Sequence, residues 1–310
     1  MPTIITLTPN PAIDLWCEAD AVKPIHKIRT FNEDLDPGGG GINVARVITA
    51  LGGDVEAICL AGGVTGALLG ELLDERGISH RLIPIAGRTR MSYTVHEHKS
   101  ALEYRFIPSG PHLTEAELES CLQAVRASEC RFFVASGSLP LGAPADFFIQ
   151  VAEIVTAKGA RFILDSSGTS LKETMQRAEV FLVKPSLSEI ESLVGRKLDD
   201  PKDQDNAAAS LVRDGFAKIV AVTLGGAGAL LATAEGVLRM PSARVEARST
   251  VGAGDSFLGA MTFALAAGRS YADALCYGVA GGAAAVLHPG TKLCNRADVD
   301  RIDAELRAAV

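Results

Sequence analysis

Several features that would define a protein class are missing from this sequence of 310 residues. Its six cysteines stand far apart without any C-x-x-C pair, which argues against a zinc site or a disulfide scaffold. Lysine and arginine form no cluster, and the formal net charge of -7 is opposite in sign to that expected of a nucleic-acid-binding protein. We therefore expect reduced, mostly buried thiols and no nucleic-acid partner.

Long hydrophobic runs are also lacking. The longest apolar stretch, 274–287, is rich in small residues and shorter than a membrane span requires. The first eleven positions carry no basic leader and are interrupted by Pro2, Pro9 and Pro11, which fits neither a signal peptide nor a transit sequence. We expect a soluble, cytoplasmic protein that does not bind membranes.

Three common catalytic motifs are absent as well. The sequence holds no Walker G-x-x-x-x-G-K-[ST], no G-x-G-x-x-G fingerprint and no G-x-S-x-G elbow. P-loop, dinucleotide-binding Rossmann and α/β-hydrolase interpretations therefore lose their main support.

The sequence does show predicted strands and helices in alternation. With 47% hydrophobic residues, the chain can build a substantial core as one large domain or two small ones, and we predict a single domain over 1–310. The expected strands are 3–8, 55–60, 81–85, 132–135, 161–165, 180–183 and 219–224. The expected helices are 42–51, 66–76, 145–158, 170–177, 187–194, 206–214 and 256–267. This alternation predicts a mostly parallel sheet with helices on both faces.

Two segments, at about 14–34 and 89–107, interrupt this alternation of strands and helices. In the second, Tyr93, Val95 and Tyr104 alternate with polar residues, which is typical of half-exposed antiparallel strands. We predict that the two insertions pair into a small sheet that acts as a lid. A small, partly apolar sheet is rarely stable alone in water, so it also predicts a homodimer surface.

The segment 249–257, STVGAGDSF, gives the strongest chemical indication. Gly252 and Gly254 bring bare backbone to the start of an apolar helix, where N–H groups attract an anion. A carboxylate at that point, Asp255, can take the proton from a hydroxyl that attacks a phosphoryl group. An ordinary Asp cap would explain the same residues. We favour a kinase, because an unused carboxylate on a buried stretch costs free energy.

Four consecutive glycines, 38–41, precede another predicted helix. They allow backbone to approach a ligand closely, and Asn43 adds both a donor and an acceptor, as a polyol substrate would require. A flexible turn capped by Asn43 is the alternative. Asp14 follows the first strand, where parallel sheets usually bind ligands, although an Asp there is often a turn residue.

Two later segments place polar or glycine residues directly after a strand. Lys184 could meet a nucleotide phosphate and Glu189 could order magnesium through water, although a surface lysine and a first-turn glutamate fit the spacing equally well. Thr223 leads into glycines at 225, 226 and 228, which offer bare backbone to a nucleotide. The best local cations for a sugar phosphate lie in or beside the insertions, but each alone is more often a solvated surface charge. They are Lys27, Arg29, Arg90 and Arg105.

Together these motifs closely resemble the ribokinase-like (PfkB) carbohydrate kinases over essentially the whole chain. The matching segments are PGGGGINVAR (37–46), AGGVTG (61–66), SGSLP (136–140), DSSG (165–168), KPSLSE (184–189) and STVGAGDS (249–256). The resemblance implies a three-layer α/β/α sandwich with a small β-sheet lid. One position departs from the family pattern, because Ser186 stands where the family has Asn. Its shorter side chain weakens the case for Ser186 in the magnesium–water network, and Glu189 is the better candidate.

The resemblance also implies a role for each segment. It makes Asp255 the base that activates the sugar 1-hydroxyl, with an anion hole at Gly252, Ala253 and Gly254. It implies sugar contacts at Asp14, Gly38, Gly39 and Asn43, and 6-phosphate contacts at Arg90 and Ser138 or Leu139, with Lys27 and Arg29 nearby. The implied ATP shelf is Lys184, Ser186, Glu189, Thr223, Gly225, Gly228 and Gly282. Family members often use a monovalent cation, and the matching positions for K⁺ are Ser249, Val251, Ala285, His288 and Gly290.

The expected activity is ATP- and Mg²⁺-dependent phosphorylation of fructose 6-phosphate at its 1-hydroxyl, the glycolytic step that gives the 1,6-bisphosphate. Tagatose 6-phosphate stays open as a substrate, because this epimer differs only in the orientation of one hydroxyl, and fructose 1-phosphate stays open as well. A sugar-phosphate sensor on a kinase fold is the non-enzymatic alternative. The intact GAGD segment, 252–255, argues against a sensor, which would not need the base.

Overall fold

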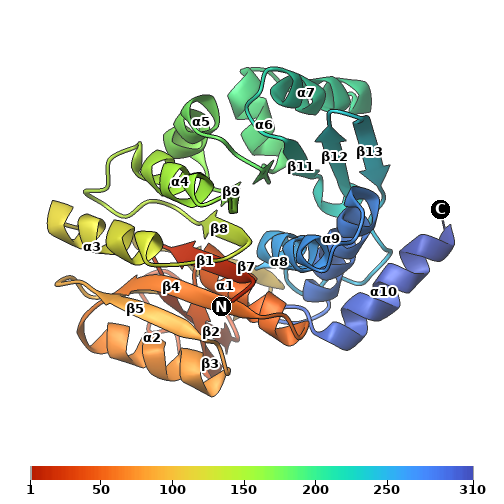
Figure 1. The fold of residues 1–310 in the computed structure, drawn as a ribbon. Coiled ribbons are helices and arrows are strands. Elements are labelled where there is room, and N and C mark those ends of the chain that lie inside the picture. Colours follow the sequence, from red (N-terminus) through yellow and green to blue (C-terminus); the bar gives the residue numbers. More distant parts are fainter. Residues whose placement is uncertain (1, 310) are drawn as a thin grey trace.

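The computed structural model describes residues 2–309, and its centre is a nine-stranded sheet (Figure 1). The strand order is β13-β12-β11-β10-β9-β8-β1-β4-β5. Neighbours from β5 to β11 are parallel, and β12 and β13 are added antiparallel at one edge. The strands are β1 (Ile4–Thr8), β4 (Val55–Ala61), β5 (His80–Pro84), β8 (Phe132–Ser136), β9 (Arg161–Asp165), β10 (Leu182–Val183), β11 (Ile219–Thr223), β12 (Ala229–Thr233) and β13 (Gly236–Met240).

Helices cover both faces of this sheet, and each face has its own hydrophobic core. The first layer holds α1 (Gly40–Ala50), α2 (Gly63–Glu75), α8 (Ala253–Ala266), α9 (Tyr271–Ala285) and α10 (Arg296–Ala309). The second holds α3 (Glu115–Arg126), α4 (Phe147–Ala157), α5 (Gly168–Arg177), α6 (Leu187–Val194) and α7 (Pro201–Arg213). The predicted three-layer α/β/α sandwich is confirmed.

Strand side chains alternate between the two cores. In β1, Ile4 packs in the first core, whereas Ile5 and Leu7 pack in the second. Because both faces are covered, every residue of the strand is buried, Thr6 and Thr8 included, as expected of a central parallel strand. The carboxyl ends of the parallel strands therefore all meet at one edge.

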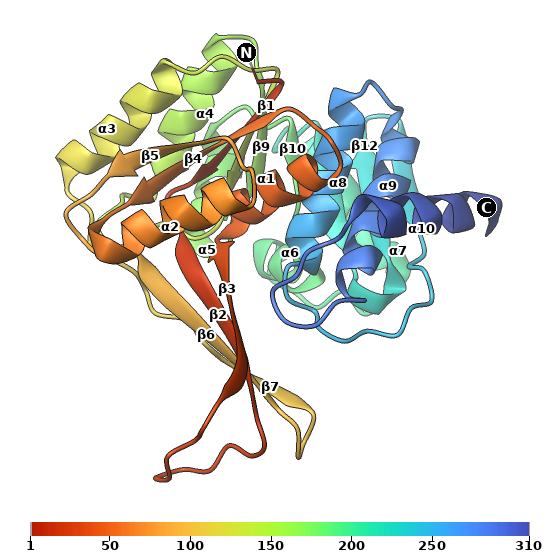
Figure 2. The ribbon, with the colours of Figure 1, turned by 90° about the horizontal axis from the view of Figure 1, so that it is seen from below.

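A separate four-stranded sheet projects from the main body (Figure 2), with the order β3-β2-β6-β7. It consists of β2 (Ala12–Ala19), β3 (Phe31–Gly38), β6 (Arg90–Glu97) and β7 (Leu102–Phe106). The predicted small sheet is present, but the antiparallel expectation is wrong for its central pair, because β2 and β6 run parallel. Each follows a parallel strand of the main sheet and leaves the same edge, so both run outward in the same direction.

Three helices and one hairpin were not predicted from the sequence. They are α3, α9, α10 and the β12–β13 hairpin. Helix α9 is the long stretch of small apolar residues, which carries no amphipathic period because it is buried on nearly all sides. Within residues 2–309, no helix has both the length and the apolarity needed to cross a membrane.

Candidate active site

The carboxyl edge of the main sheet gathers the candidate residues. Asp14 lies in β2, just beyond the end of β1, and Asp165 ends β9. Lys184 follows β10, and Thr223 ends β11. Their common position agrees with the general rule that ligands of open α/β sheets bind outside the carboxyl ends of the strands.

The N-terminus of α8 points its free N–H groups into this region. Gly252, the N-cap, has φ 72° in the left-handed region, and its carbonyl accepts the first helical hydrogen bond, from Ser256 at 2.8 Å. The helix begins at Ala253, three residues earlier than predicted, so Asp255 lies in its first turn. A side chain at Gly254 would place its Cβ 3.5 Å from Lys184 Nζ. First-turn N–H groups and an ammonium group thus meet at one point, which is suited to an anion.

Asp255 is held by an amide from the glycine-rich segment. Asn43 Nδ2 donates a hydrogen bond to Asp255 Oδ2 at 2.8 Å, which joins residues 212 positions apart. Burial raises the pKa of Asp255 to about 7, and the carboxylate of Asp165 adds to this rise. The Asn43 hydrogen bond and Lys184 act in the opposite direction. A carboxylate that titrates near neutral pH is well matched to general base catalysis.

Lys184 is itself buried, with 6% of its surface exposed. Its Nζ lies 3.1 Å from Asp165 Oδ1, and Ser136 Oγ donates to Asp165 Oδ2 at 3.1 Å. Burial alone favours the neutral amine, but the carboxylates of Asp165, Asp255 and Glu189 outweigh it and raise the pKa of Lys184. The lysine therefore stays charged beside the start of α8.

The sugar-side candidates lie against the glycine-rich segment. A Cβ at Gly38 would be 2.1 Å from Asp14 Oδ2, so only glycine admits the Asp14 carboxylate at this place. Burial raises the pKa of Asp14, whereas Arg46 lowers it. Gly39 is the N-cap of α1 and has φ 111°. The structure thus brings Asp14, Gly38 and Asn43 to the same side of Asp255.

Arg90 is fixed by main-chain carbonyls. Its Nη1 donates to Pro108 O at 2.9 Å and its Nη2 to Asn10 O at 2.8 Å, while Nε is buried without a partner. Two other 6-phosphate candidates follow β8, with Ser138 exposed and Leu139 half-buried. Asn10, buried with its Oδ1 unpaired, was not predicted.

Lys27 and Arg29 are placed differently. Both are exposed on the loop between β2 and β3, and this loop forms the outer tip of the small sheet (Figure 2). Because both strands run away from the main body, the structure does not bring these two cations together with Asp14 and Arg90 in a single chain.

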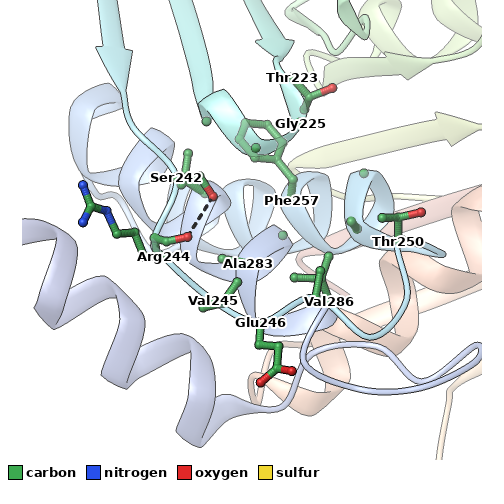
Figure 3. A pocket seen from close by; sticks show the side chains of 18 residues that line it. Thr223, Gly225, Ser242, Arg244, Val245, Glu246, Thr250, Phe257, Ala283 and Val286 are labelled. Carbon is green, nitrogen blue, oxygen red and sulfur yellow. Dashed lines mark hydrogen bonds between the residues drawn. The ribbon is translucent and has the colours of Figure 1, made fainter.

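A cavity of about 870 Å³ opens beside the start of α8 (Figure 3). Thr223 and Gly225 lie on one side, Ala283 and Val286 on the other, and the ring of Phe257 lies between them. Of the residues predicted for nucleotide binding, Thr223, Gly225, Gly228 and Gly282 line it, together with Ala253 and Gly254 of the anion hole. A nucleotide in this cavity could therefore direct its phosphates at Gly254 and Lys184.

Comparison with known proteins agrees with this geometry. The sequence profile described as pfkB family carbohydrate kinase matches residues 10–298. The chain is 46% identical to ATP-dependent 6-phosphofructokinase isozyme 2 of Mycobacterium tuberculosis, over 97% of this chain and 88% of the relative. It is 39% identical to the protein of the same name from Escherichia coli K12, over 99% of both chains.

The chain belongs to the pfkB family of carbohydrate kinases. A crystal structure of phosphofructokinase-2 from Escherichia coli in complex with fructose-6-phosphate superposes on this kinase with a TM-score of 0.94, at 38% identity, covering 99% of this chain and 100% of the other. Both the ribokinase-like fold and the family resemblance are thereby confirmed.

The magnesium candidates of this kinase form a capping box at the start of α6. Ser186 Oγ accepts from Glu189 N, and Glu189 Oε2 accepts from both Ser186 N at 2.7 Å and Ser186 Oγ at 2.8 Å. These bonds go to Oε2, which leaves Oε1 to accept from a metal-bound water. No group of three or more His, Cys, Asp or Glu side chains that could enclose a metal occurs in residues 2–309. A single carboxylate that acts through water, as Glu189 would, fits Mg²⁺, because this ion keeps several waters and binds substrate phosphates.

The two loops predicted to bind K⁺ lie side by side. Arg248 N donates to Val286 O at 2.7 Å, which joins the segment of Ser249 and Val251 to the segment that runs from Ala285 to Gly290. His288 Nε2 lies 3.3 Å from Asp298 Oδ2, so this ring nitrogen already has a partner. Ser249 Oγ contacts Glu103 of β7 at 3.4 Å, which links this region to the small sheet.

The sequence did not lead us to several of the site residues. Asp165 could have been found by the criterion that found Asp14, since it is a carboxylate at the end of a buried strand. The cavity wall at 242–247, in contrast, is irregular and mixed in composition. Phe257 and Val279 also line the cavity, but by pattern they are ordinary core residues.

Proposed function

We propose that this kinase transfers the γ-phosphoryl group of ATP to the 1-hydroxyl of fructose 6-phosphate. The observation that carries the proposal is the position of Asp255. It lies between the sugar-side group of Asp14, Gly38 and Asn43 and the cavity that ends at Gly254. Relatives of nearly the same length, at 46% and 39% identity, bear the name ATP-dependent 6-phosphofructokinase.

The residues divide the chemistry between them. Ionised Asp255 accepts the proton of the attacking hydroxyl, and a pKa near 7 lets it do so at neutral pH. The first-turn N–H groups of α8 and the charged Lys184 stabilise the negative charge of the moving phosphoryl group. Bound Mg²⁺ would neutralise phosphate charge, and Glu189 would hold it through water.

The sugar phosphate would be recognised by groups that differ in charge. Asp14 accepts hydrogen bonds from sugar hydroxyls, and Arg90 retains donors for the 6-phosphate beyond those used by Asn10 and Pro108. Ser138 and Leu139 stay predictions for the same phosphate. Lys27 and Arg29 stay predictions that would need a neighbouring subunit or a movement of the small sheet.

We also propose that K⁺ binds the backbone carbonyls of the paired loops at Ser249–Val251 and Ala285–Gly290. A structure of the Escherichia coli phosphofructokinase-2 is described as a complex with potassium, at a TM-score of 0.95 to this chain. Activity that requires K⁺ and is not supported by Na⁺ would support this site, whereas equal activity in both salts would contradict it.

A homodimer through the small sheet is a further part of the proposal. Tyr93 and Phe106 stand opposite each other in β6 and β7, with exposed fractions of 41% and 57%. Contiguous exposed apolar patches mark interaction surfaces, and we propose that this pair belongs to one. All six cysteines are free thiols, in agreement with the reducing cytoplasm that we propose as its location.

The choice of substrate is tested by comparing kcat/KM for fructose 6-phosphate, tagatose 6-phosphate and fructose 1-phosphate. We expect fructose 6-phosphate to exceed the others by about tenfold or more, because tagatose 6-phosphate misplaces one hydroxyl and fructose 1-phosphate already carries a phosphate on its 1-oxygen. Fructose 1-phosphate is the second candidate, since a relative named 1-phosphofructokinase from Haloferax volcanii is 33% identical over 96% of this chain. A higher value for either rival would overturn the assignment, and ATP-independent binding without turnover would indicate a sensor.

A further inference from the structure

A line of hydrogen bonds leads from the candidate base into the protein interior. Asp255 accepts from Asn43 Nδ2 at 2.8 Å, and Asn43 Oδ1 accepts from Arg46 Nη1 at 3.2 Å. Arg46 Nη2 donates in turn to Asp36 Oδ1 at 2.8 Å. Asn43 and Arg46 lie one turn apart on α1, so the helix itself sets their spacing.

Asp36 is the fixed end of this line. Its side chain is 1% exposed and pairs at 2.8 Å with Nη2 of Arg76, the C-cap of α2, in addition to Arg46. Thr291 Oγ1, from the loop directly after the K⁺ candidates, donates to Asp36 Oδ2 at 2.7 Å. Arg46 also donates to Pro37 O at 3.1 Å. The guanidinium of Arg46 is therefore held from several directions and has one orientation.

The chemistry of the two groups determines how the Asn43 amide must lie. An amide has an accepting oxygen at one end and a donating NH₂ at the other, whereas a guanidinium can only donate. Facing Arg46, Asn43 must present its oxygen, and its NH₂ is then aimed at Asp255. The reverse orientation would set the amide oxygen against the Asp255 carboxylate and the NH₂ against Arg46.

We propose that Arg46, anchored by Asp36, is a positioning residue that keeps the Asn43 donor directed at Asp255. The inference rests on the base role given to Asp255 in the proposed function. Arg46 does not contact the reacting atoms in this arrangement. It acts through Asn43, and Asp36 together with Thr291 connects that action to the loop predicted to bind K⁺.

The charges around Asp255 set the direction of the effect. Asp14 faces it from β2 and Asp165 from β9, and both favour the protonated carboxyl. Lys184, after β10, and the Asn43 donor favour the ionised form. If the Asn43 NH₂ no longer points at Asp255, only Lys184 opposes the effect of the two carboxylates on the pKa of Asp255. This pKa then rises, and Asp255 retains its proton at higher pH.

The test is the pH profile of kcat for Arg46→Lys, which keeps a positive charge near Asp36 but loses the planar fork. We expect the acid limb to move up by about half a pH unit or more, with a loss of roughly twofold or more at pH 7 that narrows at pH 9. The KM for ATP should stay within about twofold, since the cavity is untouched. Arg81→Lys, in an ion pair with Glu56 on β4, is the matched control and should leave the profile unchanged.

A second measurement separates positioning from a general structural effect. In an Asn43→Ala background, Arg46→Lys should cause no further shift, because its route to Asp255 is already removed. An equal shift in both backgrounds, or a wild-type profile for Arg46→Lys, overturns the inference. If Arg46→Lys does not fold, Thr291→Val decides, since it removes one donor to Asp36 without changing charge. A smaller shift in the same direction supports the inference, and an unchanged profile overturns it.

One readout does not depend on turnover. The side-chain amide resonance of Asn43 should follow the titration of Asp255 and should report a higher midpoint in Arg46→Lys than in the wild type. If the wild type fails to phosphorylate fructose 6-phosphate, the proposed function is lost. The titration midpoint of the Asn43 resonance still tests the inference in that case. A midpoint that is the same in Arg46→Lys and in the wild type would overturn the positioning role.

Discussion

At the scale of single residues, the pKa of Asp255 determines the pH range in which the kinase can work. Burial raises this pKa from 3.8 to about 7, so the base is mostly protonated below pH 7. We expect kcat to fall about tenfold per pH unit on the acid side, as for a single essential base. A pH–rate profile measured at saturating substrates checks this, and a flat profile between pH 5 and 8 would contradict it.

The same pKa has a consequence for stability. A raised pKa means that the folded protein binds this proton more tightly than the unfolded chain, so its contribution to the unfolding free energy falls as pH rises from about 4 to about 7. Asp255→Asn avoids the buried charge and should be more stable than the wild type at pH 8, by roughly 1–2 kcal/mol because the site is partly open to solvent. Urea unfolding at pH 5 and pH 8 checks this, with a difference less than about half as large expected at pH 5.

Arg90 allows a test of sugar-phosphate recognition. Arg90→Ala should raise the KM for fructose 6-phosphate about tenfold or more and the KM for ATP much less, because a charged hydrogen-bonding group to the 6-phosphate is lost. Steady-state kinetics in both substrates measure this. Since Arg90 also holds Asn10 and Pro108 by their carbonyls, equal increases in both constants would identify it as structural only.

At the scale of elements, position 254 in the first turn of α8 must remain free of a side chain. Gly254→Ala would place a methyl group 3.5 Å from Lys184 Nζ, inside the anion site. Alanine favours helix by up to about 1 kcal/mol over glycine, so thermal stability should not fall. We expect kcat/KM for ATP to fall about tenfold.

Gly70→Ala in α2 is the control, because its nearest neighbour is the end of the Leu82 side chain, and its activity should equal that of the wild type. Wild-type turnover by Gly254→Ala would show that no phosphate group approaches this turn.

Elements also show what sequence reasoning can recover. Helix α6 was predicted at its observed bounds, because Ser186 and Glu189 form the capping box at its start and Gly195, with φ 71°, ends it. Helix α9 was missed, since a helix of small residues buried on nearly all sides has no periodic signal. The parallel pairing of β2 with β6 also escaped, because alternation has a period of two in either direction.

The candidate site follows the same logic. Asp14, Lys184 and Thr223 were found because the carboxyl ends of parallel strands meet at one edge. The ion pair between Asp36 and Arg46 joins a strand of the small sheet to α1, and no local sequence pattern predicts it. The wall at 242–247 has no regular structure to predict.

At the scale of the whole molecule, the small sheet presents two unlike faces. Residues that share the face of Asp14 are mostly polar, and one of them, Glu103, contacts Ser249 of the main body. Tyr93 and Phe106 lie on the opposite face and are exposed. We propose that the first face covers the active site as a lid and that the second is the dimer surface.

Phe106→Asp should therefore weaken the dimer by about tenfold or more, because a charge is introduced into an apolar interface. Sedimentation at several concentrations measures this. Leu238→Asp, at a 47% exposed position on the edge strand β13, is the matched control and should leave association unchanged. A wild type that sediments as a monomer at all concentrations would rule out the dimer.

The central claim is that Asp255 removes the proton from the sugar hydroxyl while the start of α8 holds the phosphoryl group. The most direct test is kcat of Asp255→Asn with fructose 6-phosphate and ATP, beside calorimetric binding of the sugar phosphate. The account predicts a fall in kcat of about 10²-fold or more with binding largely retained. Turnover within a few-fold of the wild type, in a protein that still binds the sugar, would contradict it.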